Sequence, residues 1–177
     1  PLVTLLSSGT AEVKEEAAGA LSTLSLNSPS NQLAIATGLV ALLGVGSAMS
    51  QEHVTQLLLK LADDPDNRRA IAKSGSIPRL VLQLKGGGHT SVKAQELAAA
   101  ALRKLSGDSE ENVSAIAAAG GLKPIVALLA SPSPAAQAQA AAVLSYMTRT
   151  SVRNKHAVVA DGGIFPLIVL LNKENAR

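Results

Sequence analysis

The stretch NVSAIAAAGGLKPIVALL, from Asn112 to Leu129, decides the fold of this chain. Asparagine is favoured at the start of a helix, because its side-chain oxygen can accept a backbone N–H of the first turn. The pair Gly120-Gly121 supplies the kind of stop that helices commonly use, and Pro124 is tolerated at the first position of a following helix. The stretch therefore predicts a short apolar helix opened by Asn112, a glycine turn, and a second helix entered through Pro124.

Near-copies of this unit run through the chain. The motif N-x-x-A-[I/V] occurs four times, at intervals of 36, 45 and 42 residues. Its copies begin at Asn31, Asn67, Asn112 and Asn154. Each is followed by glycine and then by a second motif, an apolar pair, a spacer and leucine, which begins at Leu39, Leu80, Ile125 and Leu167. One further copy of the second motif, at Leu2, precedes them all. Longer helices are predicted over 12–25, 51–62, 91–106 and 135–148. A single helix triplet cannot bury its apolar face, so neighbouring triplets must stack.

Composition supports an all-α chain. Apolar residues make up 47% of the sequence, yet Tyr146 and Phe165 are its only aromatic residues. Leu, Ile, Val and Ala must therefore form the core, and the excess of Ala favours closely packed helices. The chain has no Cys, which excludes disulfides and cysteine-ligated zinc and fits an intracellular protein, cytoplasmic or nuclear. The longest uncharged stretches, 17–51 and 124–148, are interrupted by Gly, Pro, Ser and Gln, so no transmembrane segment is predicted.

Charge is unevenly distributed along the chain. The formal net charge is +3, but residues 1–66 carry −5 and residues 67–177 carry +8. A basic half can attract an acidic protein or nucleic acid. The scarcity of aromatic residues removes the stacking platforms that single-strand binders use, which argues against nucleic acid.

The sequence predicts neither catalysis nor a metal or other cofactor. His53, His89 and His156 lie in different repeats without the spacing of metal ligands, and His156 is expected to be a partly buried structural residue. The glycine-rich segment 86–91 lacks the G-K-[S/T] ending of a phosphate-binding loop. No nucleophile–base pair is recognisable, so a non-enzyme is expected.

The motifs resemble those of armadillo-repeat proteins, whose repeats have three helices and wind into a right-handed superhelix. The family pattern N-x-x-A-I-A-x-x-G-[A/G]-[I/L]-x-P-L-V-x-L-L, followed by E-x-A-A-x-A-L-x-N-L, extends over essentially the whole chain. The resemblance implies an α-α solenoid of about four repeats, incomplete at both ends, with boundaries near 1–30, 31–66, 67–111, 112–153 and 154–177. Residues 1–27 are similar to the armadillo regions of plant U-box and vacuolar scaffold proteins.

The resemblance also implies a binding site. Armadillo proteins bind extended peptides in a concave groove lined by the third helix of each repeat, commonly through an Asn. The matching positions here contain no Asn; they are Thr23, Lys60, Lys104 and Tyr146. The positions of the groove Trp of importin-type proteins contain no Trp; they are Gly19, Gln56, Ala100 and Ala142. A nuclear-import adaptor is therefore not expected.

Without the Asn and Trp of the family, the predicted groove is characterised by basic residues. Arg103 stands beside Lys104, and Arg149 lies further along the chain. By similarity to the catenin branch, groove lysines suit an acidic or phosphorylated peptide, because charge-assisted contacts are strong; solvated surface lysines are the alternative interpretation. The expected site therefore comprises Thr23, Lys60, Arg103, Lys104, Tyr146 and Arg149.

The leading hypothesis is a non-catalytic scaffold that binds a partner protein or peptide. The alternatives are a structural subunit packed permanently in a large assembly, and the substrate-binding part of a ubiquitin ligase whose catalytic domain lies outside this chain. One departure from the pattern follows Ile35, where the sequence is about five residues shorter than after Ile71. It predicts a tightened corner or a shortened first helix. The incomplete ends predict exposed apolar faces and a segment of a longer protein or of a complex.

Overall fold

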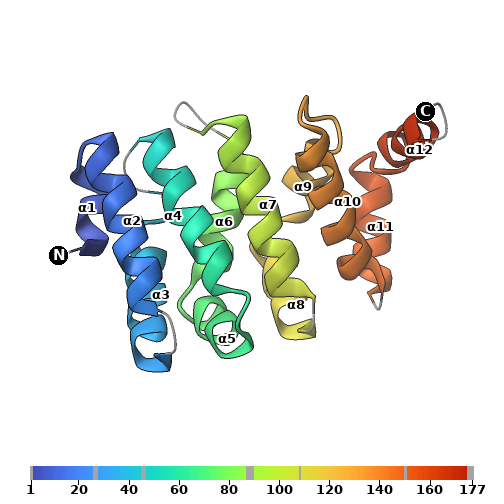
Figure 1. Cartoon of the computed structure of the whole chain (residues 1–177). Helices are drawn as coiled ribbons and strands as arrows, with labels where there is room; N and C mark the ends of the chain where they lie inside the picture. The colour runs from blue at the N-terminus through green and yellow to red at the C-terminus, as the bar shows by residue number, and fades with distance from the viewer. Residues whose placement is uncertain are drawn as a thin grey trace.

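The fold is described from a computed structural model, for residues 2–25, 28–44, 47–86, 90–107, 109–149 and 151–174. Over these ranges the chain forms a row of α-helices, with the N-terminus at one end and the C-terminus at the other (Figure 1). The helices are α1 (Leu2–Ser8), α2 (Ala11–Ser25), α3 (Pro29–Leu42), α4 (Ala48–Leu61), α5 (Pro65–Lys73), α6 (Ser76–Leu84), α7 (Val92–Ser106), α8 (Glu110–Ala118), α9 (Leu122–Leu128), α10 (Pro134–Arg149), α11 (Val152–Ala160) and α12 (Ile164–Glu174).

The predicted order of first, second and third helix is present from α5 onward. The triplets are α5–α6–α7 and α8–α9–α10, and α11–α12 begins a further one. The third helices α2, α4, α7 and α10 lie side by side in Figure 1, and consecutive members of this series are in contact. The first helices α5 and α8 occupy the lower edge of the same view.

The core is aliphatic and continuous along the row. Leu102, Ile116, Ile125 and Leu129 are fully buried, and Met147 continues the same cluster in α10. Burying one such side chain stabilises the folded state by about 1.5–3 kcal/mol. Apolar residues of successive triplets pack into one shared core, so the prediction that repeats must stack is correct.

The prediction that the repeated asparagine opens the first helix is wrong. The capping residue stands three positions earlier: the Ser109 hydroxyl accepts the Asn112 backbone N–H at 3.1 Å, and Ser151 does the same for Asn154 at 3.2 Å. Serine is as good a cap as asparagine, which frees the asparagine side chain for another bond. Asn112 Nδ2 donates to the Leu105 carbonyl at 2.7 Å, and Asn154 Nδ2 donates to the Met147 carbonyl at 2.8 Å. The motif asparagine thus ties the first helix to the preceding third helix.

The glycine pairs form a corner between the first and second helices. At the end of α8, Gly120 has φ +74°, and Gly121 donates to the Ile116 carbonyl at 2.9 Å. This is the Schellman arrangement, in which a residue with positive φ closes the helix end. Gly121 serves a second purpose, since a Cβ there would lie 3.2 Å from Val81 Cγ2 of the preceding repeat. Gly163 meets Val126 Cγ2 at 3.4 Å in the same way.

The corner predicted after Ile35 does not form. Residues Pro29–Leu42 make one continuous helix, α3, which takes the place of both a first and a second helix. With about five residues fewer than in the other repeats, this segment has no spare chain for a turn, and Gly38 lies inside the helix. A Cβ on Gly38 would lie 3.2 Å from Val3 Cγ1, so this glycine allows α3 to approach α1 closely.

The second helices begin earlier than their prolines predict. Pro78, Pro124 and Pro166 are each the third residue of a helix rather than the first. The missing N–H of proline still costs nothing there, because the N–H groups of the first turn have no partner within the helix.

Candidate functional site

The four third helices present their residues in a common register. A hydroxyl caps each of them: Ser91 accepts the Ala94 N–H at 2.9 Å, and Ser133 accepts the Ala136 N–H at 3.2 Å. Thr10 and Ser47 make the equivalent contacts with Val13 at 3.3 Å and with Ser50 at 3.3 Å. The residues thirteen positions after these caps are Thr23, Lys60, Lys104 and Tyr146. These four predicted residues therefore occupy one row across the face formed by α2, α4, α7 and α10, which we call the third-helix face.

Hydrogen bonds between neighbouring third helices fix the upper part of this face. The Ser91 hydroxyl donates to Glu52 of α4, and the Ser133 hydroxyl donates to Glu96 of α7 at 3.0 Å. The Lys93 ammonium donates to Glu96 at 2.5 Å. This bond, helped by the bond from Ser133, holds the pKa of Glu96 below its usual value, although partial burial acts in the opposite direction. Glu52 and Glu96 are thus occupied in joining α4, α7 and α10.

Lys104 is committed within the chain. Its ammonium donates to the Leu59 carbonyl at 3.0 Å and forms an ion pair with Asp63. Both partners belong to the preceding repeat, so the contact joins α7 to the end of α4. The Lys104 side chain is only 24% exposed, whereas that of Asp63 is 73% exposed. Lys104, which was predicted to be a groove cation, therefore already has an acidic partner within the chain.

Arg103, Tyr146 and Arg149 lie toward the other end of the row. Arg103 Nε donates to the Gln139 side-chain oxygen of α10 at 2.7 Å. The Arg149 guanidinium lies over the Tyr146 ring, 5.9 Å from its centroid. Such a contact contributes about 0.5–1 kcal/mol at an exposed site. Neither arginine has a carboxylate partner within the described ranges.

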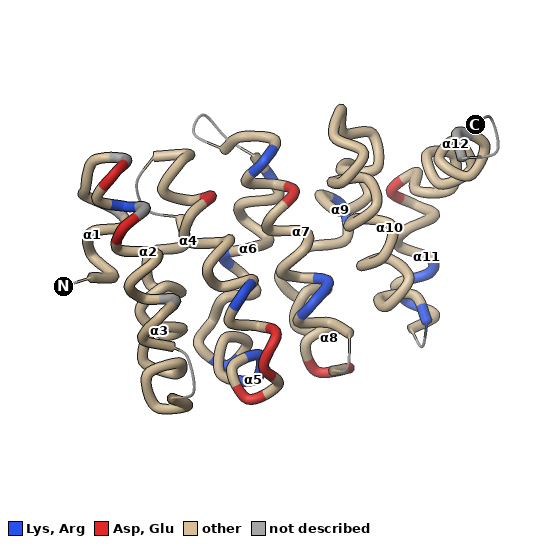
Figure 2. Tube along the Cα trace, viewed as in Figure 1, with Lys and Arg blue, Asp and Glu red and all other residues tan. Residues whose placement is uncertain are grey.

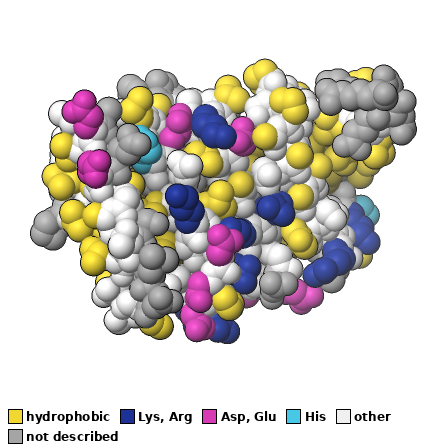
Figure 3. Space-filling view, viewed as in Figure 1, with side chains coloured by type: hydrophobic (Ala, Val, Ile, Leu, Met, Phe, Trp, Pro, Cys, Tyr) yellow, Lys and Arg dark blue, Asp and Glu magenta, His cyan; other side chains and the backbone are white. Residues whose placement is uncertain are grey.

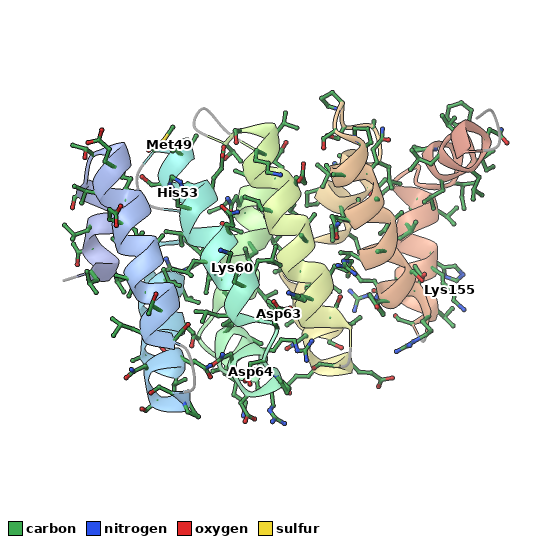
Figure 4. The ribbon with its side chains drawn as sticks, in the orientation of Figure 1. Met49, His53, Lys60, Asp63, Asp64 and Lys155 are labelled. Carbon is green, nitrogen blue, oxygen red and sulfur yellow. The ribbon has the colours of Figure 1, made fainter. Side chains whose placement is uncertain are left out.

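Thr23 and Lys60 are brought together in a pocket between α2 and α4. The pocket has a volume of about 490 Å³ and is lined by Ala18, Gly19, Thr23, His53, Gln56, Leu57 and Lys60. Met49, His53 and Lys60 follow one another down α4, and Asp63 lies just beyond its end (Figure 4). Lys60 is exposed, and no ion-pair or hydrogen-bond partner is found for it in the described part of the chain. The Thr23 hydroxyl donates to the Gly19 carbonyl at 3.0 Å, so it can only accept from a ligand.

Two groups of this face were not predicted from the sequence. His53 had been considered only as a metal ligand, yet it lines the pocket, and its buried Nδ1 atom has no hydrogen-bond partner among the described residues. Asp63 lies in the loop between α4 and α5 and pairs with Lys104. Counting from the caps places Asp63 three residues beyond the row, but only the stacking of α4 on α7 brings it to Lys104.

Charges are separated along the molecule. Acidic residues mark the α2 end of the tube in Figure 2, and basic residues mark α11. The space-filling view shows the same separation, with acidic side chains over the α1–α2 end and basic ones over the α10–α11 end (Figure 3). His156 is exposed in α11, which corrects the prediction of a partly buried structural histidine. His89 and residues 87–88 lie outside the described residues.

Two further pockets lie between successive first helices. One, of about 420 Å³, lies between α5 and α8, and the other, of about 390 Å³, lies between α8 and α11. Their linings correspond position by position: Arg68, Ala72 and Ile77 of the first match Val113, Ala117 and Leu122 of the second. The pockets are therefore a product of the repeat.

An apolar surface covers the last two helices. Val159, Ile164, Phe165, Ile168 and Leu171 are all about half exposed or more. Within the described residues no single helix has the length and apolar composition to cross a membrane. Taken together, α11 and α12 have this length and composition, but the two helices are bent by 82° relative to each other. In the same residues no group of three His, Asp or Glu side chains is placed to hold a metal ion.

Comparison with known proteins agrees with the repeat. The sequence profile of the Armadillo/beta-catenin-like repeat matches residues 1–26, 64–107 and 109–149. The unmatched interval 27–63 contains the fused helix α3. No curated protein matches the sequence.

Solved structures share the architecture. A crystal structure of an engineered protein from the Northeast Structural Genomics Consortium superposes with a TM-score of 0.78 at 30% identity, covering 96% of this chain and 70% of that one. A designed armadillo repeat protein in complex with the peptide (KR)4 gives 0.78 at 19% identity, with 97% and 73% covered. Computationally designed armadillo repeat proteins for modular peptide recognition give 0.77 at 22% identity, with 96% and 73% covered. The predicted armadillo-type solenoid is confirmed.

Proposed function

Because the chain belongs to the armadillo/β-catenin-like repeat family, we propose that it is a non-catalytic scaffold whose third-helix face binds an extended, acidic segment of another protein. The observation that carries this proposal is the excess of cations around the predicted row. Lys60, Arg103, Lys104 and Arg149 lie on or beside it, and Asp63 pairs with Lys104 alone.

The physical reason is complementarity of charge and shape. An extended peptide presents carboxylates at intervals along a line, and a row of helices presents cations at intervals across its face. Charge-assisted hydrogen bonds are the stronger kind, so they can hold a flexible ligand that pays conformational entropy on binding. The designed relative with (KR)4 supports peptide binding by this architecture, and the sign of the charges distinguishes this chain from a binder of basic peptides.

The test compares three labelled peptides of equal length by fluorescence anisotropy: (DE)4, (KR)4 and (GS)4. We expect (DE)4 to bind most tightly, and its affinity to fall as salt screens the charges. No binding of any of the three, or a preference for (KR)4, would overturn the proposal. Replacing both Arg103 and Arg149 with Gln should weaken (DE)4 binding. Replacing Arg69 and Arg79 with Gln removes the same charge from a first and a second helix, and it should not weaken (DE)4 binding.

The apolar surface of α11 and α12 favours a second candidate function, that of a subunit in a larger assembly. Ile168 and Leu171 stand at positions that are buried in the preceding repeat, as Val126 and Leu129. A permanent partner that covers these residues would make the chain structural rather than a reversible binder. The two candidates separate on solution behaviour: a chain that is monomeric at the low concentration of the anisotropy assay and captures (DE)4 supports the reversible scaffold.

A further inference from the structure

The pocket between α2 and α4 contains a cation that is available to a ligand. Lys60 lies on its wall, exposed and without a partner among the described residues. Gln56 stands one turn before Lys60 on α4 and offers amide N–H donors. Gly19 leaves room on the α2 side, since a Cβ at this position would meet no atom within 4 Å. The pocket therefore combines a free ammonium, a neutral donor and open space.

The next position along the same row is closed. Lys104 is equivalent to Lys60, but its ammonium is held by the Leu59 carbonyl at 3.0 Å and by the Asp63 carboxylate. A carboxylate of the chain thus occupies the place that a ligand carboxylate would need. A second acidic group brought to Lys104 would have to displace Asp63 and would meet its like charge at close range.

From this contrast we infer that the pocket between α2 and α4 is the subsite that takes an aspartate or glutamate side chain of the bound segment, while Asp63 keeps acidic side chains away from Lys104. The carboxylate accepts hydrogen bonds from Lys60 Nζ and from the Gln56 amide. Asp63 is then a specificity-determining residue, because it fixes where along the row the acidic side chain of the ligand binds. The inference rests on the proposed function, since it assigns a subsite within that binding face.

The charge around the pocket supports a carboxylate as its occupant. Lys60 is the formally charged residue of the lining, and the other polar members are Thr23, His53 and Gln56. Asp63, the first acidic residue after the end of α4, forms an ion pair with Lys104. An incoming carboxylate therefore meets the unpaired Lys60 ammonium in the pocket and the Lys104–Asp63 ion pair beyond it.

The test follows (DE)4 binding by nuclear magnetic resonance and by anisotropy in matched variants. In the wild-type chain, the backbone amides of Gly19, Thr23 and Lys60 should shift most, and that of Lys104 least. Lys60→Gln should lower the affinity about fivefold, near the upper limit for a partly exposed ion pair, and Lys60→Arg should restore most of it. Lys155→Gln removes the same charge from an exposed site on α11 (Figure 4) and should leave the affinity within about twofold.

Asp63→Asn supplies a gain-of-function arm. It frees Lys104 with little change in shape, so (DE)4 affinity should rise about fivefold, and the amide of Lys104 should now shift on binding. Asp161→Asn, which removes an equal charge from the exposed end of α11, is the control and should change the affinity little.

The outcomes separate the inference from the proposed function. If (DE)4 binds but Lys60→Gln and Lys155→Gln weaken it equally, or Asp63→Asn and Asp161→Asn strengthen it equally, the subsite is wrong and the scaffold stands. If none of (DE)4, (KR)4 and (GS)4 binds the wild-type chain, the proposed function itself fails. Binding of a phosphoserine peptide without measurable binding of (DE)4 would overturn the carboxylate assignment. Circular dichroism melting of each variant shows that affinity changes are not due to unfolding.

Discussion

At the scale of single residues, the repeated asparagine is the most informative side chain. Its backbone N–H goes to a capping serine, and its side-chain amide goes to a carbonyl at the end of the preceding third helix. The carbonyls in the last turn of a helix have no partner within that helix, so a donor from outside must satisfy them when they are buried. The asparagine is this donor in three repeats, at Asn31, Asn112 and Asn154.

Asn154→Ala should therefore destabilise the chain by about 1–3 kcal/mol, because it leaves the Met147 carbonyl without a partner in a buried place. Asn154 is only 6% exposed. Asn154→Asp keeps the shape but lacks an amide hydrogen, so it should be at least as harmful. Asn31→Ala removes the same kind of bond at an exposed site and should cost less. Urea unfolding followed by circular dichroism provides the comparison, and equal losses at Asn154 and Asn31 would contradict this account.

At the scale of elements, the corner between first and second helices holds neighbouring repeats in register. Val81 packs against Gly121 and Val126 packs against Gly163, one repeat further along. Both of these corners thus combine a positive-φ glycine that closes the helix with a second glycine that admits a valine from the repeat before it, whereas the α5–α6 corner has Ser76 at the second position. A side chain at this second position would push two repeats apart.

Gly121→Ala should destabilise the chain by about 1–3 kcal/mol, the range for overpacking. The new Cβ would lie 2.7 Å from Ile116 Cγ2 and 2.8 Å from the Ile116 carbonyl oxygen. Gly19→Ala provides the opposite control, because Gly19 is helical and its Cβ would have open space. That change should stabilise the chain by about 0.5–1 kcal/mol. The two melting temperatures should move in opposite directions, and a stabilised Gly121→Ala would show that the corner is loosely packed.

Much of this element structure could be predicted from sequence, because capping, glycine stops and apolar periodicity are local signals. The helices around Asn112–Leu129 lie within a few residues of their predicted places. The role of Asn112 was mistaken because its bond is made to Leu105, in a different helix. The fusion of α3 was also missed: a shortened corner and a continuous helix need equally few residues, and packing against Val3 is not visible in the segment 29–42.

At the scale of the whole molecule, stacking decides which groove residues are available. Register within each third helix placed Lys60 and Lys104 at equivalent positions, and on sequence grounds they are alike. Stacking α7 on α4 then brings Asp63 to Lys104, whereas no acid reaches Lys60 in the described chain. The candidate residues were thus predictable from the repeat, but their division into a free and an occupied cation depends on contacts between repeats.

The same stacking leaves an apolar surface on α12. Ile168 is 50% exposed and Leu171 is 64% exposed, whereas their equivalents Val126 and Leu129 are 5% and 2% exposed. In the preceding repeat the valine is covered by the next glycine corner. An exposed surface of this kind favours association, because covering it removes apolar area from water. We expect the chain as described to self-associate as its concentration rises.

Sedimentation velocity across a range of concentrations measures this association, and substitution locates it. Ile168→Ser with Leu171→Ser should shift the chain toward the monomer with little loss of folded stability, since both side chains are already exposed. Leu82→Ser on α6 is the matched control: Leu82 is 62% exposed but lies away from α12, so its loss should not change the association. A wild-type chain that stays monomeric would contradict the prediction, because the apolar surface of α12 would then remain exposed to solvent without causing association. Equal effects of the α12 and α6 changes would show that association occurs through another part of the molecule.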